Sequence, residues 1–285
     1  MKNKTVIAFV DGSQYSNIVC QYAAWLASKN KSKIKLYHIS EKKEDPSKTD
    51  LSGALKLGAK TALLENLTEF SANASRTRHA EGWAILEKAK LELEDIGTFV
   101  VETRLRTGDI ADALSRKEEA ADVVLIGKRG EAKQNNQSRL GLNFERIVRA
   151  STKPIFVANR NFREIKSILV GYDGSPATRK IIDFISNYDF LSGAEITLAQ
   201  ANKAKTIIHD QMSEAEKQLK SSGVAVKKVE LLGDPKVELA SMIAEQNFDL
   251  LAIGAYGHSK VRSFILGSTT SRLIQTVKVP VLLIR

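Results

Sequence analysis

The sequence is poor in cysteine, and its single thiol, Cys20, leaves no disulfide to form within the chain. This composition fits a reducing compartment, so we expect a cytoplasmic protein. We also expect Cys20 to be a small buried residue of a helix rather than a reactive thiol. Long hydrophobic runs are missing too, since each apolar run is far shorter than the roughly 18 residues of a membrane span. The start, MKNKTVIAFVDGS, offers only about six apolar residues before a turn, too few for the core of a signal peptide.

Acidic residues are fewer than basic ones, which gives a net charge of +10, and most of the excess lies before residue 160. The densest basic patch is segment 128–139. Charge alone is compatible with nucleic-acid binding. No aromatic and basic interleaving and no zinc-ligand spacing accompanies it, so a solvated basic surface is favoured over nucleic acid as a partner. The four histidines do not cluster with carboxylates at metal-ligand spacing, and no protein-built metal site is predicted.

An internal repeat of domain size divides the chain, and such repeats decide the fold. The matching segments occur in the same order in both halves, and Pro154 aligns with Pro280. The matches are VIAFVDGSQYS (6–16) with ILVGYDGSPAT (168–178), SKIKLYHIS (32–40) with AEITLAQAN (194–202), RTGDIADAL (106–114) with LLGDPKVEL (231–239), ADVVLIGKRG (121–130) with FDLLAIGAYG (248–257), and STKPIFVA (151–158) with TVKVPVLLI (276–284).

The repeat predicts two domains, residues 1–160 and residues 161–285, joined by a short polar link near 158–166. Asp11 and Asp173 are 162 residues apart, whereas Gly108 and Gly233 are only 125 apart. The first domain therefore carries a 37-residue insertion between its second and third strands. Much of the insertion has helical periodicity, at Leu63, Leu67 and Phe70 and again at Leu86, Ala89 and Leu93, so we expect one or two long helices there.

Each half alternates short β-branched apolar runs with segments of helical periodicity. Parallel strands need long crossover connections, so this alternation predicts an α/β fold in which helices cover both faces of a parallel sheet. Ligands of such sheets bind at the carboxyl ends of the strands, where the strand order reverses. The residues that follow each strand are therefore the first candidates for a site.

In the second half, Asp173 lies between a strand and a helix, because Ser175 and Pro176 form a strong helix start. Its carboxylate either only shapes the turn or meets a ribose hydroxyl, an adenine amino group or a metal-bound water. The fourth strand runs into Gly254 and Gly257, where the backbone can approach an anion closely.

Nine residues after Gly257, Gly267 leads into Ser268, Thr269 and Thr270, which we expect in the first turn of a helix. Hydroxyls and unpaired N–H groups at a helix start form an anion site. The pattern is not a Walker A loop, since that loop needs Gly-Lys-Ser/Thr at the helix start. Nor is it the dinucleotide fingerprint, because the glycines follow a late strand.

This glycine spacing, together with Asp173 after the first strand, resembles the universal stress protein family over both halves of the chain. The resemblance implies two tandem five-stranded parallel-sheet domains of flavodoxin/Rossmann-like type that bind adenine nucleotide. It implies ATP, with Mg²⁺ in some members, as cofactor, and the strand after Pro280 as the edge for pairing between domains. The nucleotide-binding residues it implies are Asp173, Ala201, Gly254, Ala255, Gly257, Gly267, Ser268, Thr269 and Thr270.

The first half carries an altered copy of the motif, in which Asp11, Gly127, Gly130 and Gly141 remain. Ten residues instead of nine separate its last two glycines, and Leu142 replaces the serine that aligns with Ser268. A leucine there removes a phosphate ligand and fills space. We therefore expect this degenerate site to bind ATP poorly or not at all, and the first half to serve mainly as a built-in partner.

The leading hypothesis is an ATP-binding regulatory stress-response module whose nucleotide is held mainly by the second domain. An adenine-nucleotide-dependent enzyme, such as a slow ATPase or a phosphotransferase, stays an alternative, although no catalytic motif or general base is recognisable. A ligand-free interaction protein is a third possibility. Intramolecular pairing of the domains is expected, a homodimer is left open, and the sequence names no signalling pathway.

Overall fold

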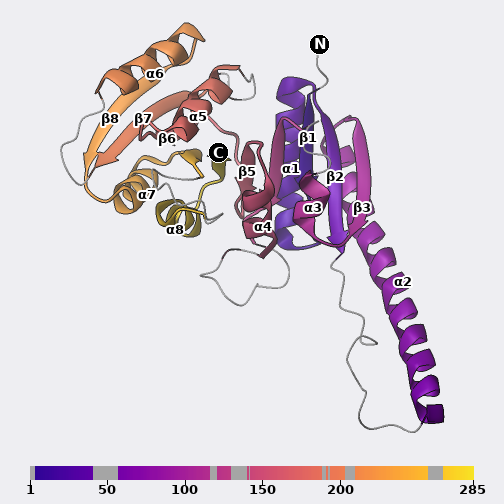
Figure 1. Cartoon of the computed structure of the whole chain (residues 1–285). Helices are drawn as coiled ribbons and strands as arrows, with labels where there is room; N and C mark the ends of the chain where they lie inside the picture. Colours follow the sequence, from indigo (N-terminus) through magenta and orange to yellow (C-terminus); the bar gives the residue numbers. More distant parts are fainter. Residues whose placement is uncertain are drawn as a thin grey trace.

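The computed structural model describes residues 4–40, 57–115, 121–129, 140, 142–187, 191, 193–202, 209–255 and 266–285. Strands and helices alternate along each half of the chain (Figure 1). The strands are β1 (Thr5–Phe9), β2 (Lys33–Ser40), β3 (Val101–Thr107), β4 (Val123–Gly127), β5 (Ile155–Ala158), β6 (Ser167–Gly171), β7 (Glu195–Asn202), β8 (Val226–Leu232), β9 (Leu250–Gly254) and β10 (Val281–Ile284). The helices are α1 (Gln14–Asn30), α2 (Leu57–Ile96), α3 (Ile110–Ser115), α4 (Leu142–Ala150), α5 (Pro176–Asn187), α6 (His209–Ser221), α7 (Pro235–Gln246) and α8 (Ser268–Thr276).

The strand order confirms the predicted fold class in both halves. The first half has the order β3-β2-β1-β4-β5 and the second half has β8-β7-β6-β9-β10, with parallel pairing inside each half. In each half the order reverses between the first strand and the fourth. The carboxyl ends of β1 and β4, and of β6 and β9, are thus the places where a ligand is expected.

The two halves meet through β5 and β10, which pair antiparallel and complete one ten-stranded sheet. In this pairing Phe156 lies opposite Leu282, and these two residues are also equivalent in the sequence repeat. The pairing therefore has a local two-fold axis through residues that correspond to each other. One chain reproduces here the geometry of an isologous contact between two copies.

The core consists of two apolar clusters, one on each face of the sheet. One cluster includes Tyr22, Leu86, Ile182 and Leu219, from α1, α2, α5 and α6. The other includes residues of α3, α4, α7 and α8. Each cluster contains side chains from both halves, so the hydrophobic core runs through the whole molecule.

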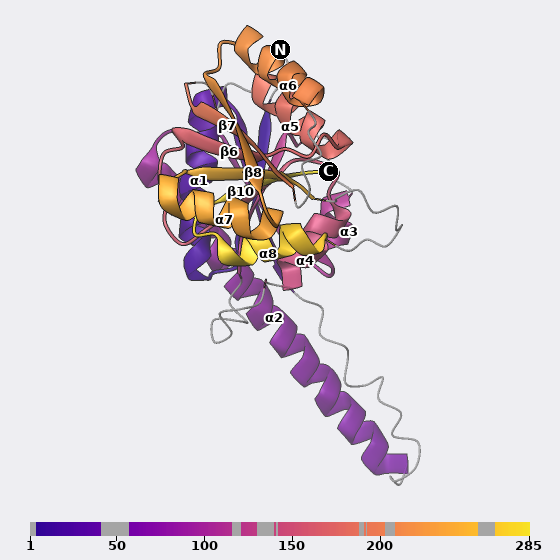
Figure 2. The ribbon, with the colours of Figure 1, turned by 90° about the vertical axis from the view of Figure 1, so that its left-hand side faces the viewer.

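The region that carries the insertion contains one helix, α2, of 40 residues, while residues 41–56 lie outside the described part of the chain. Its carboxyl-terminal part packs on the first half, where Leu86, Ala89 and Leu93 are buried as their spacing predicted. At about 1.5 Å per residue the helix is roughly 60 Å long. Its amino-terminal part extends away from the sheet (Figures 1 and 2).

The segment between the halves is packed rather than a simple polar link. The ring of Phe162 lies 4.9 Å from that of Tyr22, and Arg163 forms an ion pair of 3.6 Å with Asp249 at the start of β9. Ile165 is buried in the core. The Phe162–Tyr22 contact ties the start of the second half to α1, so the halves are joined by side chains as well as by strands.

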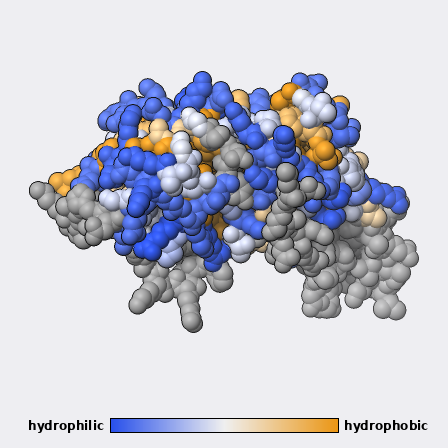
Figure 3. Space-filling view, turned by 90° about the horizontal axis from the view of Figure 1, so that it is seen from above, coloured by the Kyte–Doolittle hydropathy of each residue, from blue (hydrophilic) through white to orange (hydrophobic). Residues whose placement is uncertain are grey.

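The visible surface in Figure 3 is mostly hydrophilic, with smaller groups of hydrophobic residues between. Among the helices of the described residues, none is long and apolar enough to cross a membrane. Cys20 is fully buried between α1 and α2, where its Sγ lies 3.7 Å from the carbonyl oxygen of Ala89. Burial raises the pKa of this thiol, so the prediction of a packed, unreactive cysteine agrees with its surroundings.

Candidate functional site

The turn after β6 places Asp173 at the mouth of a cavity and fixes its carboxylate. Oδ1 of Asp173 accepts the backbone N–H of Ser175 at 2.9 Å and the hydroxyl of Thr178 at 3.1 Å. Gly174 takes a positive φ of 73° there, which favours glycine. Helix α5 begins at Pro176, and Oγ of Ser175 accepts the N–H of Thr178, as the helix-start pattern predicted. Asp173 therefore does shape the turn, whatever else it does.

The start of α8 supplies the polar wall of the same cavity. Gly267 is the N-cap and makes no side-chain cap hydrogen bond, so the first N–H groups of the helix have no side-chain acceptor at that position. Ser268 is exposed and Thr269 is half-buried. The hydroxyl of Thr270, in contrast, is buried and donates to the carbonyl oxygen of Gly254 at 3.0 Å. Thr270 thus joins α8 to β9, while Ser268 and Thr269 are more accessible.

The cavity has a volume of about 350 Å³ and lies at the carboxyl ends of β6, β7 and β9. Seven of the nine residues predicted for the second-half site line it, namely Asp173, Ala201, Gly254, Gly267, Ser268, Thr269 and Thr270. Ala255 is not among the lining residues, since it is buried and its N–H donates to the carbonyl oxygen of Ile284 at 2.8 Å. Gly257 lies outside the described residues. Ala201 lies within β7, one residue before its end.

The floor of the cavity is apolar and was not predicted. Tyr172, Ala199, Leu239 and Ile253 line it. The hydroxyl of Tyr172 donates to the carbonyl oxygen of Gln211 at 3.2 Å, and burial raises the pKa of this phenol. Gly171 completes the floor, because a Cβ there would lie 3.0 Å from the side chains of Ile253 and Leu239. Small residues at 171 and 199 leave the floor open.

In the first half the equivalent space is filled by aromatic side chains. Phe9 corresponds to Gly171 in the repeat, and Tyr37 corresponds to Ala199. Phe9 is the register partner of Tyr37 in the first half, and Gly171 is the register partner of Ala199 in the second. The two rings are buried, with centroids 5.6 Å apart. The repeat alignment already contains this difference, since it pairs Phe9 with Gly171 and Tyr37 with Ala199.

The turn around Asp11 keeps the geometry of its counterpart. Oδ1 of Asp11 accepts the N–H of Ser13 at 3.0 Å and the hydroxyl of Ser16 at 3.1 Å. Gly127 is also in place, although the side chain of Tyr15 packs so closely that a Cβ at Gly127 would meet it at 2.7 Å. Gly130 and Gly141 lie outside the described residues, as does the side chain of Leu142.

Helix α2 adds a second cover to the first half. A Cβ at Gly12 would lie 3.1 Å from the side chain of Ile85, and one at Gly82 would lie 2.6 Å from that of Leu105. The helix therefore sits against both the Asp-Gly turn and the carboxyl end of β3. The carboxyl-terminal part of α2 thus packs directly beside the first-half counterpart of the cavity.

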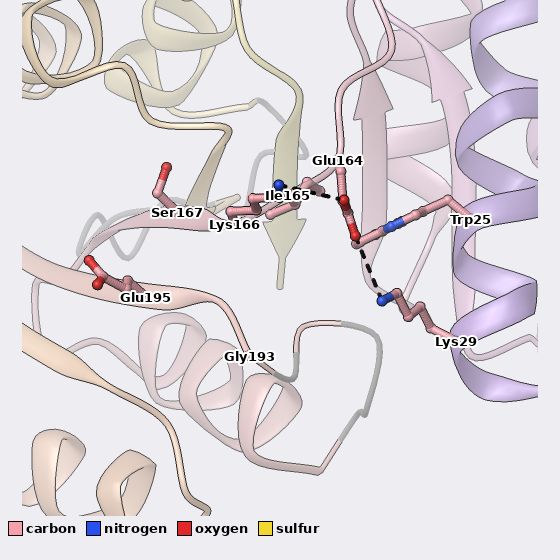
Figure 4. A pocket seen from close by; sticks show the side chains of 8 residues that line it. All are labelled: Trp25, Lys29, Glu164, Ile165, Lys166, Ser167, Gly193 and Glu195. Carbon is pink, nitrogen blue, oxygen red and sulfur yellow. Dashed lines mark ion pairs between the residues drawn. The ribbon is translucent and has the colours of Figure 1, made fainter.

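A second hollow, of about 530 Å³, lies between the halves near the amino ends of β6 and β7 (Figure 4). Glu164 forms ion pairs there with Lys29 at 3.8 Å and Lys166 at 3.9 Å. The hollow is open and its charges are largely paired with each other. It also lies away from the strand ends that parallel sheets use for ligands. The smaller cavity is therefore the better candidate site.

Within the part of the chain that the structure describes, no three His, Cys, Asp or Glu side chains form a group that could hold a metal ion. Asp173 and Tyr172 are the ionisable residues among those lining the candidate cavity. A divalent cation at this site would thus depend on ligands that a bound phosphate brings with it.

The fold and site together define a duplicated α/β protein with an open cavity at a topological switch point. The model of the universal stress protein family matches residues 2–159 and again residues 164–285. The universal stress protein Slr1230 of Synechocystis is 31% identical over 99% of this chain and 100% of its own length. The chain belongs to the universal stress protein family, as a tandem member.

Solved structures agree on the fold. A universal stress protein from Archaeoglobus fulgidus has a TM-score of 0.69 at 18% identity, covering 100% of this chain and 97% of its own. A universal stress protein solved in complex with cAMP covers 43% of this chain and is itself covered to 98%, at 25% identity, with a TM-score of 0.37. The second likeness is too low to carry an argument about this chain.

Proposed function

We propose that the second half binds an adenine nucleotide of the ATP class and that the protein acts as a regulatory nucleotide-binding module. The observation that carries this proposal is the cavity of about 350 Å³ beside the start of α8. Its size falls at the lower end of small-molecule sites, which span roughly 300–1,000 Å³. Its floor is apolar and its wall polar, a combination suited to a base and a phosphate chain.

The residues divide by chemistry. The apolar floor around Ala199, Leu239 and Ile253 suits a purine ring, and the end of β7 at Ala201 offers backbone groups to its edge. The start of α8 suits the phosphates, since the helix dipole and the N–H groups that have no partner within the helix favour an anion there. Ser268 and Thr269 add hydroxyls. The carboxylate of Asp173 suits a ribose hydroxyl or a water bound to Mg²⁺, which would be held mainly by phosphate oxygens.

The first half, in this proposal, holds no nucleotide and acts as a built-in partner. The support is steric, because the Phe9 and Tyr37 rings are buried where the second half has Gly171 and Ala199. Opening that space would expose two aromatic side chains that pack in the core. The β5–β10 pairing then gives the first half a structural role in the same molecule.

A binding module is favoured over an enzyme by the surroundings of Asp173. Its Oδ1 already accepts two hydrogen bonds from the α5 start, so the carboxylate is engaged in holding the turn. The described lining offers no second carboxylate or histidine. Release of phosphate at a sustained rate would speak for the enzyme instead.

Calorimetric titration of the full chain with ATP tests the proposal. We expect one ATP per chain. Ser268→Leu imports the residue found at position 142 and should weaken ATP binding about tenfold or more, because a bulky apolar group replaces a phosphate ligand. Ser222→Leu, at an exposed serine far from the cavity, is the matched control and should bind like the wild type. Two ATP per chain would overturn the assignment of the first half, and no binding would overturn the whole proposal.

A further inference from the structure

The carboxyl-terminal end of α8 is held by the first half, although its amino-terminal end belongs to the second-half cavity. Nζ of Lys128, from the residue after β4, donates to the carbonyl oxygens of Gln275 at 3.2 Å and Val277 at 2.9 Å. Nδ2 of Asn159, from the residue after β5, donates to Val277 at 3.3 Å. The last carbonyls of a helix lack partners within it, and here the other half supplies them.

This cap is a built feature rather than a surface contact. Lys128 is only 6% exposed and Asn159 only 8%. The backbone N–H of Lys128 also donates to the carbonyl oxygen of Ala158 at 3.0 Å, so its main chain is fixed to β5. Burial, followed by repulsion from Arg129 and Arg160, lowers the Lys128 pKa to about 8. Burial thus disfavours the charged form of the lysine, whereas the negative end of the α8 dipole, which the ammonium group faces, favours it.

The lysine of this cap has no counterpart across the local two-fold axis. The residue equivalent to Lys128 in the repeat is Ala255, which makes the corresponding backbone hydrogen bond to Ile284 but has no side chain to reach α4. The end of α4 receives instead an exposed hydrogen bond, from Nη1 of Arg285 to the carbonyl oxygen of Arg149 at 3.2 Å. The buried lysine therefore serves the helix that faces the open cavity.

Helix α8 is short, with nine residues, of which Thr270, Leu273 and Ile274 are buried. Its length is about 13 Å at 1.5 Å per residue. The two ends of so short a helix move together, so a cap at one end bears directly on the N–H groups at the other. Preorganised donors bind an anion more tightly than donors that must first be ordered.

We propose that Lys128 of the first half is a positioning residue for the phosphate-binding end of α8, so that the second-half site depends on the degenerate motif of the first half. This inference rests on the proposed function. The altered glycine motif of the first half would then still have a role. Its Gly127 is followed by Lys128, which holds the carboxyl-terminal end of α8, the helix of the intact motif. The lysine acts through the helix and does not itself touch a ligand.

Binding of adenosine and of ATP to the full chain separates a phosphate effect from a general one. Lys128→Met should weaken ATP binding about threefold to tenfold, the effect of one or two lost hydrogen bonds, and should leave adenosine binding unchanged. Lys180→Met is the matched control, because Nζ of Lys180 donates to the carbonyl oxygen of Arg285 at 3.0 Å on an exposed surface. This variant should match the wild type with both ligands.

The outcomes are distinct. Equal ATP affinity in Lys128→Met and wild type would overturn this inference and leave the proposed function standing, and so would equal weakening of ATP and adenosine. A wild type that binds neither compound would overturn both. If Lys128→Met does not fold, Asn159→Ala removes the second donor of the same cap, and its ATP-to-adenosine ratio decides in the same way.

Discussion

At the scale of single residues, two positions of the repeat differ most at the candidate cavity. Gly171 and Ala199 line the cavity of the second half, while the buried rings of Phe9 and Tyr37 occupy these positions in the first. The strands have the same register in both halves, so the backbone does not account for the difference. Side-chain volume at these two positions differs, and close-packed interiors tolerate few voids.

Lys128 gives a prediction about stability and pH. Its pKa in the folded chain is about 8, below the value near 10.4 expected when unfolded. Between these values the unfolded chain binds the extra proton, so the contribution of Lys128 to the free energy of unfolding should rise with pH. Between pH 7.5 and pH 10.5, the free energy of unfolding of the wild type should rise on the order of 1–3 kcal/mol relative to that of Lys128→Met.

Urea unfolding of both proteins at several pH values measures this gain. Comparison with the variant removes the titration of all other groups from the result. A free-energy difference that stays flat over this range would mean that the lysine is better solvated than its burial indicates.

Sequence reasoning reached the candidate site through its glycines and hydroxyls and named seven of the fifteen residues that line the cavity. It missed the floor, because apolar residues such as Leu239 and Ile253 look the same in a core and in a pocket. It also placed Thr270 with the phosphate ligands, although the hydroxyl proton of Thr270 is donated to Gly254. Only the fold shows which way a hydroxyl in a first helical turn points.

At the scale of elements, α2 is the main departure from the repeat. Its counterpart α6 has 13 residues, so the insertion lengthens an existing helix instead of adding a domain. Periodicity predicted the buried positions of its carboxyl-terminal part correctly. The sequence could not tell that this helix would lie against Gly12 and the end of β3, since such contacts join segments far apart in the chain.

The packing of α2 predicts contrasting effects of two leucines. Leu86 is fully buried, whereas Leu91 on the same helix is 53% exposed. Leu86→Ala should lower the free energy of unfolding by about 2–5 kcal/mol, because it leaves a cavity in the core. Leu91→Ala should change it by only about 0.5 kcal/mol, as surface substitutions do. Chemical denaturation followed by circular dichroism measures both, and equal losses would contradict the packing described for α2.

At the scale of the whole molecule, the two apolar clusters that run through both halves predict cooperative unfolding. Both tryptophans, Trp25 and Trp83, belong to the first half, so tryptophan fluorescence reports on that half. Leu198 is fully buried in β7 of the second half. Leu198→Ala should nevertheless shift the fluorescence midpoint to lower denaturant, by a loss of about 2–5 kcal/mol.

Leu232→Ala is the control, since Leu232 is 67% exposed at the end of β8, and it should leave the midpoint in place. A fluorescence midpoint that stays unchanged in Leu198→Ala, while circular dichroism reports an earlier second-half transition, would show that the halves unfold separately. The sequence repeat alone could not distinguish these cases. It defines two similar units but not the shared core between them.

The antiparallel pairing of β5 with β10 has a consequence for how this molecule can change over generations. In an assembly of two identical copies every substitution appears on both sides of the axis, so a lysine gained on one side is gained on the other. Here Phe156 and Leu282 face each other from one chain, and each side is encoded separately. The first half can therefore carry Lys128 where the second half carries Ala255, and Tyr37 where the second half carries Ala199. Neither half has to accept the residue that suits the other.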